Sequence, residues 1–231
     1  MDNRDTAINW QGRLQMAPDF VLLQGAIGAT SAHAHFAHQF LWAPGQRLQV
    51  SLDGDAYTSE RFFIPALQAH EILAAAENVF TVFAEPTEFP SARLQKELAT
   101  AEPSLAGLTQ ALGRARQAAA LDTRLLSALA ALDASLTENK INAQELAQHA
   151  SLSLSQLERL FGQQIGMPVR RLVLWRRLRL ALVLALSGET LTNAAHGAGF
   201  ADAAHFSRTM RQMFGVRADQ TLRGFRIEVI A

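Results

Sequence analysis

The sequence predicts an α+β protein with a small N-terminal β-barrel, trailing helices, and an all-α C-terminal domain that contains two helix-turn-helix patterns. Three observations support this fold class. Between Phe20 and Phe89 the apolar runs are short and separated by turn-forming residues. After Pro90 the apolar residues recur with helical periodicity. From Glu145 to Phe161 and again from Leu191 to Phe214, two helical stretches flank a tight turn.

Composition indicates a folded chain that stays inside the cell. The 231 residues are 49% hydrophobic and 18% charged, which suits two domains of ordinary size. No apolar run reaches the roughly 18 residues that cross a membrane, and charged residues near the N-terminus (Asp2, Arg4 and Asp5) replace the apolar core of a signal peptide. Cysteine is absent, which excludes disulfides and thiolate metal sites and fits a reducing compartment. We therefore expect a soluble, cytoplasmic protein with no membrane partner.

The charge is divided unequally along the chain. Residues 1–120 contain 8 basic and 12 acidic residues, whereas residues 121–231 contain 13 and 9. Within residues 151–226 there are 11 arginines and 4 acidic residues, so positive potential gathers there. A guanidinium group can hold phosphate or a guanine edge through two hydrogen bonds. We expect a domain boundary between residues 120 and 121, after an alanine-rich stretch.

The first domain is predicted to contain several short strands. The clearest hairpin signal is Asp53-Gly54, which follows a strand with alternating apolar residues. Strands of this length and spacing are typical of a small barrel or sandwich. The expected strands are Phe20–Leu23, Gln39–Trp42, Arg47–Leu52, Arg61–Ile64 and Val79–Phe83.

Helical periodicity begins after the last of these strands. Leucines from Leu94 to Leu112 predict trailing helices, with breaks at Glu102-Pro103 and at Gly113. These helices either carry the chain out of the barrel or form the seam of a dimer, since their apolar stripes must be buried. The sequence alone leaves both alternatives open.

The second domain begins with a helix from Thr123 to Leu136, capped by Asp122 and ending near Asn139-Lys140. Asn142 can cap the first helix of the first helix-turn-helix pattern, with Glu145 as its capping-box partner.

After the turn at Ser151–Ser153, a helix is expected from Leu154 to Gln164, and Gly166 ends it. Pro168 then starts an arginine-rich connecting helix that reaches Leu186 and spans about 28 Å, close to one turn of B-DNA. Its arginines (Arg171, Arg177 and Arg179) either face DNA or only solvate the helix and form internal pairs.

These blocks resemble the AraC-type family of transcription regulators over about residues 122–223. The first block comprises Leu146-Ala147, Ser153 to Phe161 and Gly166-Met167-Pro168; the second comprises Ala195 to Arg208 with Phe214-Gly215; between them stands Arg177-Leu178-Arg179 with Ala181 and Leu184. Two blocks in this order make the match specific. The chain departs from the family where Met210 replaces a Phe, and where Val216-Arg217-Ala218 lacks the usual Ser-Pro.

The resemblance implies a sequence-specific regulator of transcription, not an enzyme, whose partner is double-stranded DNA. Each helix after a turn would enter one of two adjacent major grooves. Other candidate partners are a small-molecule effector, RNA polymerase and a second copy of the chain. The residues that match DNA-facing positions are Ser153, Ser155, Gln156, Arg159, Asp202, Ala203, Ala204, His205, Ser207, Arg208 and Arg211. Arg159 and Arg208 could read guanine or hold phosphate, and Gln156 could read adenine.

The front half is similar to a cupin barrel in its histidines. His33 and His35, followed by Gln39, precede a second block in which a proline leads to His70. This similarity implies a sensing or dimerising domain and a divalent metal, such as Zn²⁺ or Fe²⁺, held by His33, His35 and His70. Gln39 replaces the acidic ligand of the family, and Leu67 replaces a Gly. The alternative is that no cofactor binds and the histidines are hydrogen-bonded lining.

A pocket in the barrel mouth is expected to be lined by Phe36, Trp42, Tyr57 and Phe63, although aromatic residues at strand spacing are also ordinary core. Two other functions compete with a ligand-controlled regulator. One is a metal-dependent cupin enzyme with a helical appendage. The other is a constitutive DNA binder whose barrel is purely structural.

Overall fold

The computed structural model describes residues 10–136 and 142–230, which form two compact units. The first unit draws on Met1–Ala119 and Met210–Ala231, and the second is Ala120–Thr209. The expected C-terminal domain, residues 121–231, therefore divides between two units. The reason is a strand at the end of the chain, β9 (Phe225–Val229), which pairs with the first strand of the N-terminal part.

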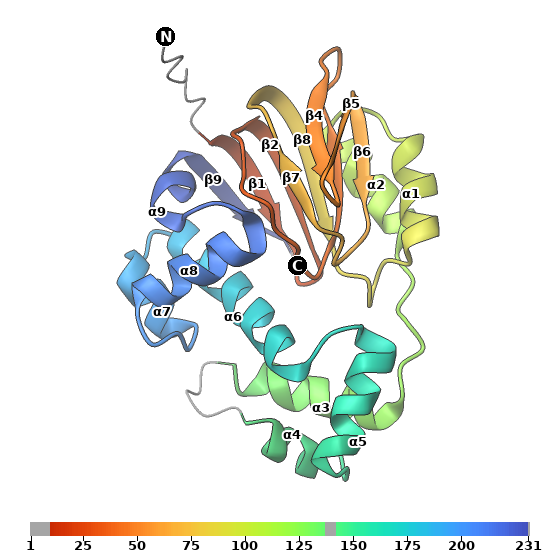
Figure 1. The fold of residues 1–231 in the computed structure, drawn as a ribbon, viewed down its shortest axis with the longest axis vertical. Helices are drawn as coiled ribbons and strands as arrows, with labels where there is room; N and C mark the ends of the chain where they lie inside the picture. Colours follow the sequence, from red (N-terminus) through yellow and green to blue (C-terminus); the bar gives the residue numbers. More distant parts are fainter. Residues whose placement is uncertain (1–9, 137–141, 231) are drawn as a thin grey trace. The chain divides into compact units, whose positions relative to one another are not determined.

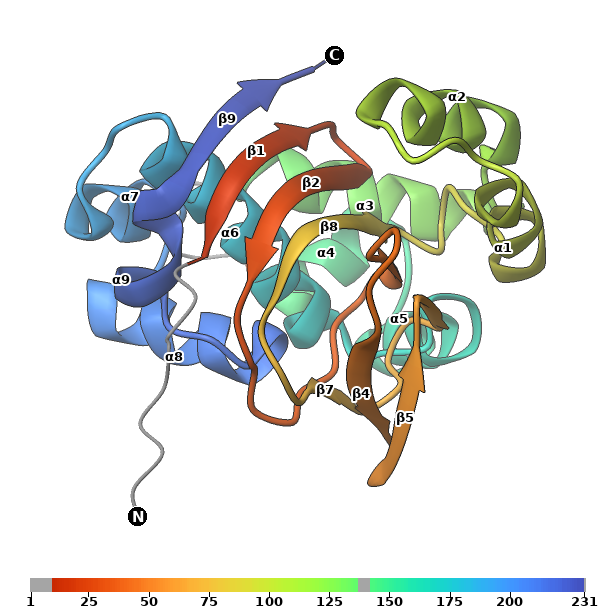
Figure 2. The same ribbon diagram turned by 90° about the horizontal axis from the view of Figure 1, so that it is seen from above.

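The strands of the first unit form two sheets, and neither closes into a barrel among the described residues (Figures 1 and 2). The six-stranded sheet has the order β6-β3-β8-β2-β1-β9, and the three-stranded sheet has the order β5-β4-β7. All pairs are antiparallel except β1 with β9. The bounds are β1 (Gln11–Met16), β2 (Phe20–Ile27), β3 (His38–Trp42), β4 (Leu48–Leu52), β5 (Asp55–Ser59), β6 (Arg61–Ile64), β7 (His70–Ile72) and β8 (Ala76–Ala84).

The five expected strands are present, and the Asp53-Gly54 turn joins β4 to β5 as predicted. Asp53 and Gly54 both have positive φ, at 51° and 100°, as a tight hairpin turn of this kind requires. Strand β5 contains the segment at Ala56 that the hairpin prediction required, whereas β1, β7 and β9 were not predicted. The β-rich N-terminal part and the mainly helical C-terminal part of the prediction are confirmed, but the C-terminal part is not entirely helical because of β9.

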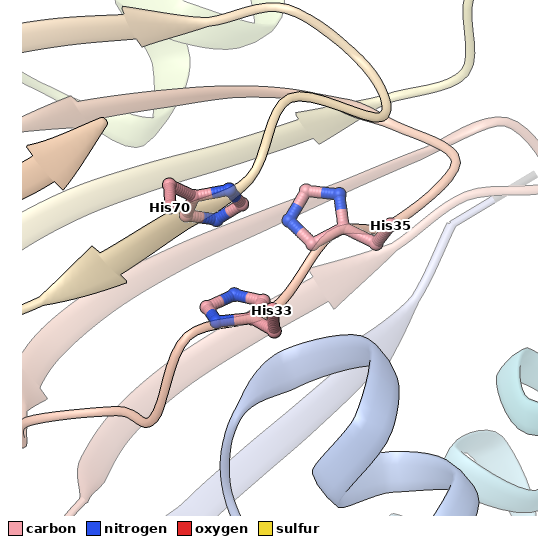
Figure 3. Close-up of side chains that lie close together, drawn as sticks. All are labelled: His33, His35 and His70. Atoms are coloured by element: carbon pink, nitrogen blue, oxygen red, sulfur yellow. The ribbon is translucent and has the colours of Figure 1, made fainter. Parts of the chain in front are cut away.

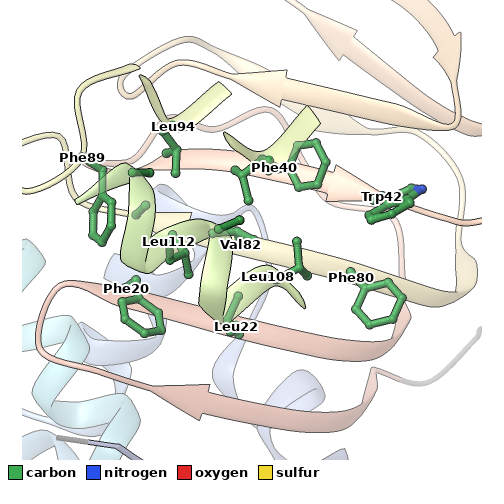
Figure 4. Packing of buried hydrophobic residues seen from close by; sticks show 14 of the residues in the cluster. Phe20, Leu22, Phe40, Trp42, Phe80, Val82, Phe89, Leu94, Leu108 and Leu112 are labelled. Carbon is green, nitrogen blue, oxygen red and sulfur yellow. The ribbon is translucent and has the colours of Figure 1, made fainter. Parts of the chain in front are cut away.

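Successive side chains of the six-stranded sheet serve two different cores, because side chains alternate across a strand. Phe40 and Trp42 belong to the core that the helices α1 (Ser91–Ala99) and α2 (Leu105–Ala115) cover (Figure 4). Leu41, between them, belongs to the core shared with strands β4 and β7. The buried residues of α1 and α2 that complete the first core are Leu94, Leu98, Leu108, Ala111, Leu112 and Ala115. The apolar stripes of these helices are thus used inside the unit, which removes the argument for a dimer seam.

In the second unit, helix α3 (Thr123–Ala134) begins as predicted, with the Asp122 side chain accepting a hydrogen bond from the backbone N–H of Arg124. Its predicted end near Asn139-Lys140 lies outside the described residues. Asn142 caps α4 (Ala143–His149) by accepting from the backbone of Gln144 and Glu145, again as predicted.

Helix α5 (Leu154–Leu160) continues into a short π-helix, η1 (Phe161–Ile165), that ends at Gly166 with φ +80°. The connecting helix α6 (Val169–Leu186) starts after Pro168. Its length, at about 1.5 Å per residue, is near the expected 28 Å.

The remaining elements are α7 (Leu191–Gly197), α8 (Ala203–Phe214), α9 (Ala218–Thr221) and a 3-10 turn, η2 (Leu222–Gly224), before β9. The boundary between the units falls within α8, between Thr209 and Met210. None of the described helices combines the length and apolarity that a membrane crossing needs.

Candidate nucleic-acid interface and histidine cluster

The first helix-turn-helix pattern consists of α4, a turn at Ser151, and α5. Ser153 and Gln156 form a reciprocal capping box at the start of α5: the Ser153 hydroxyl accepts from the Gln156 backbone, and the Gln156 Oε1 accepts from the Ser153 N–H at 2.9 Å. The Ser155 hydroxyl lies 3.2 Å from that of Ser153. Three of the four expected DNA-facing residues thus hold the helix start, and Gln156 could read adenine only by leaving its cap, at a cost of about 1 kcal/mol. Arg159 is exposed one turn further on.

The second pattern consists of α7, a turn at Gly199, and α8. The Asp202 carboxylate accepts from the His205 backbone N–H and caps α8. The buried face of α8 contains Phe206, Met210 and Met213, so Met210 occupies a core position that a Phe could also fill. The exposed face contains Ala204, Arg208 and Arg211, which recur at helical spacing.

The other expected residues of α8 lie beside this exposed face. Ala203, His205 and Ser207 are partly exposed. The His205 ring packs edge-on against Phe200, with ring centroids 5.1 Å apart, so His205 contributes to helix packing. None of the expected residues on α5 or α8 is buried in the interior.

The arginines of the two helices differ from Arg176 and Arg177 of the connector. Arg159, Arg208 and Arg211 are exposed, and their side chains form no hydrogen bond or ion pair with any residue that the structure describes. By contrast, Arg176 of α6 lies 3.6 Å from Asp133, and burial lowers the pKa of Arg177, whose guanidinium group packs against Gly199. The helices after the turns therefore present guanidinium groups that are free to meet phosphate, and so does the exposed Arg170 at the start of α6.

The three histidines of the expected metal site lie together in the first unit (Figure 3). The segment before β3 forms a backbone bridge with β7, in which His33 and His70 each donate a 2.9 Å hydrogen bond to the other's carbonyl. Their ring centroids are 4.1 Å apart, and that of His35 is 5.0 Å from that of His70. Backbone pairing between distant segments thus brings the two sequence blocks into one cluster.

One nitrogen of each ring is hydrogen-bonded to a nearby backbone carbonyl. The Nδ1 atoms of His33, His35 and His70 lie 2.8, 3.1 and 2.9 Å from the carbonyls of Ser31, Ala37 and Gln68. Since a carbonyl only accepts, the Nδ1 atoms of His33 and His70 donate and their Nε2 atoms keep a lone pair, whereas the His35 Nε2 also lies 3.3 Å from the Gln39 Oε1. The His70 Nε2 is buried and has no partner in the described part of the chain.

Burial keeps these rings neutral. The pKa of His33 is lowered to about 4, first by burial and then by the charge of His70. Burial, followed by the charges of His70 and His33, holds the pKa of His35 well below its usual range, and burial also lowers the pKa of His70. Neutral imidazoles are the form that binds metal.

The geometry of the cluster suits a divalent ion. The candidate ligand atoms lie within 4.8 Å of one another. Three nitrogens bound to a tetrahedral Zn²⁺ at bond lengths near 2.0 Å would be roughly 3.3 Å apart. The three rings would therefore need to move only slightly toward one another to bind the ion. A ring N–H donated to a backbone carbonyl is the usual support of a metal-binding histidine. The buried, unpaired Nε2 of His70 is what a ligand would satisfy.

Both departures from the cupin pattern have structural consequences. The Gln39 Oε1 lies 3.3 Å from the His35 Nε2, so an amide stands where a carboxylate ligand was expected. Leu67 has φ +67°, the left-handed conformation that favours Gly, and its N–H donates to the His35 carbonyl at 2.9 Å.

The expected aromatic pocket is wrong. Tyr57 is 50% exposed, whereas Trp42 is buried in the core under α1 and α2, and Phe63 packs against that same core. Phe36 is fully buried. Trp42 and Phe63 thus pack in the core under the helices and Tyr57 faces solvent, so these residues do not line one cavity.

The end of α8 also lies against the histidine cluster, which the sequence did not indicate. The Phe214 ring is 5.4 Å from that of His35, and the Gly215 carbonyl accepts from the Ser31 N–H at 3.0 Å. No pattern in the sequence relates positions so far apart.

Comparison with known proteins supports the helical part of this description. A family model described as a helix-turn-helix domain matches residues 146–224. No curated protein matches the chain.

Among solved structures, ToxT from Vibrio cholerae is similar over 88% of this chain and 98% of its own, with 11% identity and a TM-score of 0.57. The same protein with a bound unsaturated fatty acid gives a TM-score of 0.53 at 11% identity, over 87% of this chain and 93% of its own. A transcriptional regulator with an AraC-type DNA-binding domain from Chromobacterium violaceum is 28% identical over 41% of this chain and 85% of its own, with a TM-score of 0.39.

The likeness to ToxT concerns the fold: a β-rich N-terminal part followed by helices. The family match covers both turns and both of the helices that follow them. Residues 146–224 of this chain therefore match a helix-turn-helix domain, and the chain as a whole combines this domain with a β-rich N-terminal part, as in the fold of ToxT.

Proposed function

We propose that this protein regulates transcription by reading a specific site in double-stranded DNA with α5 and α8. The observation that carries the proposal is the set of exposed, unpaired arginines on the helices after the two turns: Arg159, Arg208 and Arg211. Arginine contacts to phosphate supply much of the affinity of such proteins, and contacts to base edges supply the specificity. The protein would act in the cytoplasm, where it meets the chromosome and RNA polymerase.

The residues expected to contact DNA would have different roles. Arg159, Arg208 and Arg211 would hold phosphate or guanine, while Ala203 and Ala204 offer apolar contact to a thymine methyl group. Ser153, Ser155, Gln156 and Asp202 act first on the starts of the helices, where backbone N–H groups can also bind phosphate. Ser207 and His205 would contact the backbone of the duplex.

The test begins with a duplex selected from genomic fragments by the full chain. We expect Arg208→Ala to weaken its binding by about 5- to 150-fold, the equivalent of about 1 to 3 kcal/mol. Arg13→Ala is the matched control, since Arg13 is an exposed arginine of β1. Equal affinities of the two variants over a range of salt concentrations would refute the assignment of α8.

We also propose that His33, His35 and His70 hold a divalent transition-metal ion, with Zn²⁺ as the first choice. Two observations favour this over a structural lining: the candidate ligand atoms lie within 4.8 Å of one another, and the buried His70 Nε2 has no hydrogen-bond partner among the described residues. We infer that the metal serves regulation, not catalysis, because residues 146–224 match a helix-turn-helix domain. An enzyme would instead turn over a substrate, and His35→Gln would abolish that turnover.

An effector of the N-terminal part is a further element of the proposal. One of the ToxT structures contains an unsaturated fatty acid, but the aromatic residues expected to line a pocket here do not converge. The histidine cluster is the site in this chain best suited to receive a signal. Dimerisation would need a surface other than the apolar stripes of α1 and α2, and analytical ultracentrifugation of the full chain would detect it.

A further inference from the structure

The last turn of α8 is held by the segment that carries two of the clustered histidines. The Gly215 carbonyl, one residue beyond the end of α8, accepts hydrogen bonds from both the N–H and the hydroxyl of Ser31, at 3.0 and 3.1 Å. The Gly215 N–H donates to the Arg211 carbonyl at 2.9 Å, so this residue also closes the helix. Arg211 is one of the exposed arginines of α8.

The side chains make a second contact at the same place. The Phe214 ring lies 5.4 Å from that of His35 and 5.5 Å from that of Phe83. A Cβ on Gly215 would lie 2.8 Å from the His33 Nδ1. The end of α8 therefore touches both His33 and His35 without intervening space.

Ser31 connects the two features through its backbone. Its carbonyl lies 2.8 Å from the His33 Nδ1 and accepts the ring N–H, while its N–H and hydroxyl hold Gly215. Binding a metal requires the ligand nitrogens to approach from as far as 4.8 Å to roughly 3.3 Å. The orientation of the His33 ring, and with it the position of Ser31, would then be set by the bound ion.

We propose that a divalent metal ion held by His33, His35 and His70 fixes the last turn of α8 and so tightens DNA binding. The inference rests on the proposed roles of α8 and of the histidine cluster. A reading helix whose end is already held loses less freedom when it enters the groove, which increases affinity. Linkage is reciprocal, so DNA must tighten metal binding by the same factor.

The experiment uses the full chain, stripped of metal and then loaded with Zn²⁺. Fluorescence anisotropy measures its affinity for the selected duplex in each state, and competition with a chromophoric chelator measures Zn²⁺ affinity with and without the duplex. We expect Zn²⁺ to tighten DNA binding by about 5- to 150-fold, the usual range of coupling between sites. Hydrogen exchange should slow at the amides of Ser31 and Gly215.

Two variants distinguish this route from a general stabilisation. Ser31→Ala combined with Phe214→Leu removes the hydroxyl bond and the ring contact but keeps all three ligands. This double variant should still bind Zn²⁺, and Zn²⁺ should tighten its DNA binding less than that of the wild type, because only the backbone bond from Ser31 to Gly215 remains; an unchanged effect of Zn²⁺ would contradict the route through these side chains. His149→Gln, at an exposed histidine of α4, should behave as the wild type.

Each failure has its own signature. The protein could bind both stoichiometric Zn²⁺ and DNA, with Zn²⁺ leaving the DNA affinity unchanged or lowering it. That result would overturn this inference alone. Absence of Zn²⁺ binding would overturn the metal proposal together with the inference. Absence of DNA binding in both states would refute the proposed regulator. Even without DNA binding, hydrogen exchange with and without Zn²⁺ would show whether the ion fixes the end of α8. Equal exchange rates at the amides of Ser31 and Gly215 in the two states would overturn the inference.

Discussion

Gly215 is the residue where a single methyl group should be most damaging to the contact between α8 and the histidine cluster. Its φ is +70°, and a Cβ there would lie 2.3 Å from the Ser31 carbonyl oxygen, 2.8 Å from the His33 Nδ1 and 2.9 Å from the Thr30 Cβ. Gly45 provides a matched control, because its φ is +73° and nothing lies within 4 Å of the position of its Cβ. Comparison of Gly215→Ala with Gly45→Ala therefore separates the clash from the backbone conformation.

The magnitude follows from three contributions. An alanine in the left-handed conformation costs about 1 to 2 kcal/mol. Replacing Gly by Ala also lowers the conformational entropy of the unfolded chain, which stabilises the folded state by about 0.4 to 1 kcal/mol. Gly45→Ala should therefore lower the free energy of unfolding by about 1 kcal/mol. Gly215→Ala adds overpacking, about 1 to 3 kcal/mol, and weakens the bonds from Ser31, about 1 kcal/mol. We expect a total loss of about 3 to 5 kcal/mol.

Urea unfolding of the metal-free full chain, followed by circular dichroism, would give the global free energy for both variants. Hydrogen exchange at the Ser31 amide would reveal a local release of residues 210–230 if this costs less than complete unfolding. Exchange at β9 would report whether the strand leaves β1 at the same time. A difference between the two alanine variants below about 1 kcal/mol in both measurements would refute the close packing at Gly215.

Three further predictions concern single positions. Gln39→Glu should tighten Zn²⁺ binding by about 10- to 100-fold, because a carboxylate would then stand beside the His35 Nε2, from which the Gln39 Oε1 lies 3.3 Å. Competition with a chelator would measure the affinity, and an unchanged affinity would contradict the proposed metal site. Ser151→Gly should raise the free energy of unfolding by about 0.5 to 1 kcal/mol, because exposed Ser151 has φ +55°, a conformation that favours Gly. A lower free energy of unfolding in urea would contradict this prediction. Burial lowers the pKa of His38 below 6.5 in the folded chain. As the pH falls, His38 is therefore protonated in the unfolded chain before it is protonated in the folded chain, and the free energy of unfolding decreases below about pH 6.5. His38→Asn should reduce the pH dependence of the free energy of unfolding by at most about 1.4 kcal/mol per pH unit. Urea unfolding at several pH values would measure this, and an unchanged pH dependence would contradict the role given to His38.

The parts of this protein that local interactions specify were predictable from the sequence. Helix caps at Asp122, Asn142 and Ser153 depend on neighbours within three residues, and the Asp53-Gly54 hairpin depends on two adjacent backbone conformations. The two helix-turn-helix patterns are of the same kind, because each combines helical periodicity with a short turn. Gly113 was wrongly predicted to interrupt a helix, since it lies inside α2, where packing of the flanking leucines outweighs its low helix propensity.

Contacts between distant segments were decided only by the tertiary structure. Nothing local marks β9 as the partner of β1, or Gly215 as the residue that meets Ser31 and His33. The sequence by itself determined that three histidines and two helix-turn-helix patterns are present, because residue types and periodicity are local properties. Their chemistry depends on which backbones pair: the bridge between His33 and His70 turns separated histidines into a cluster, and the same packing sets the end of α8 against it.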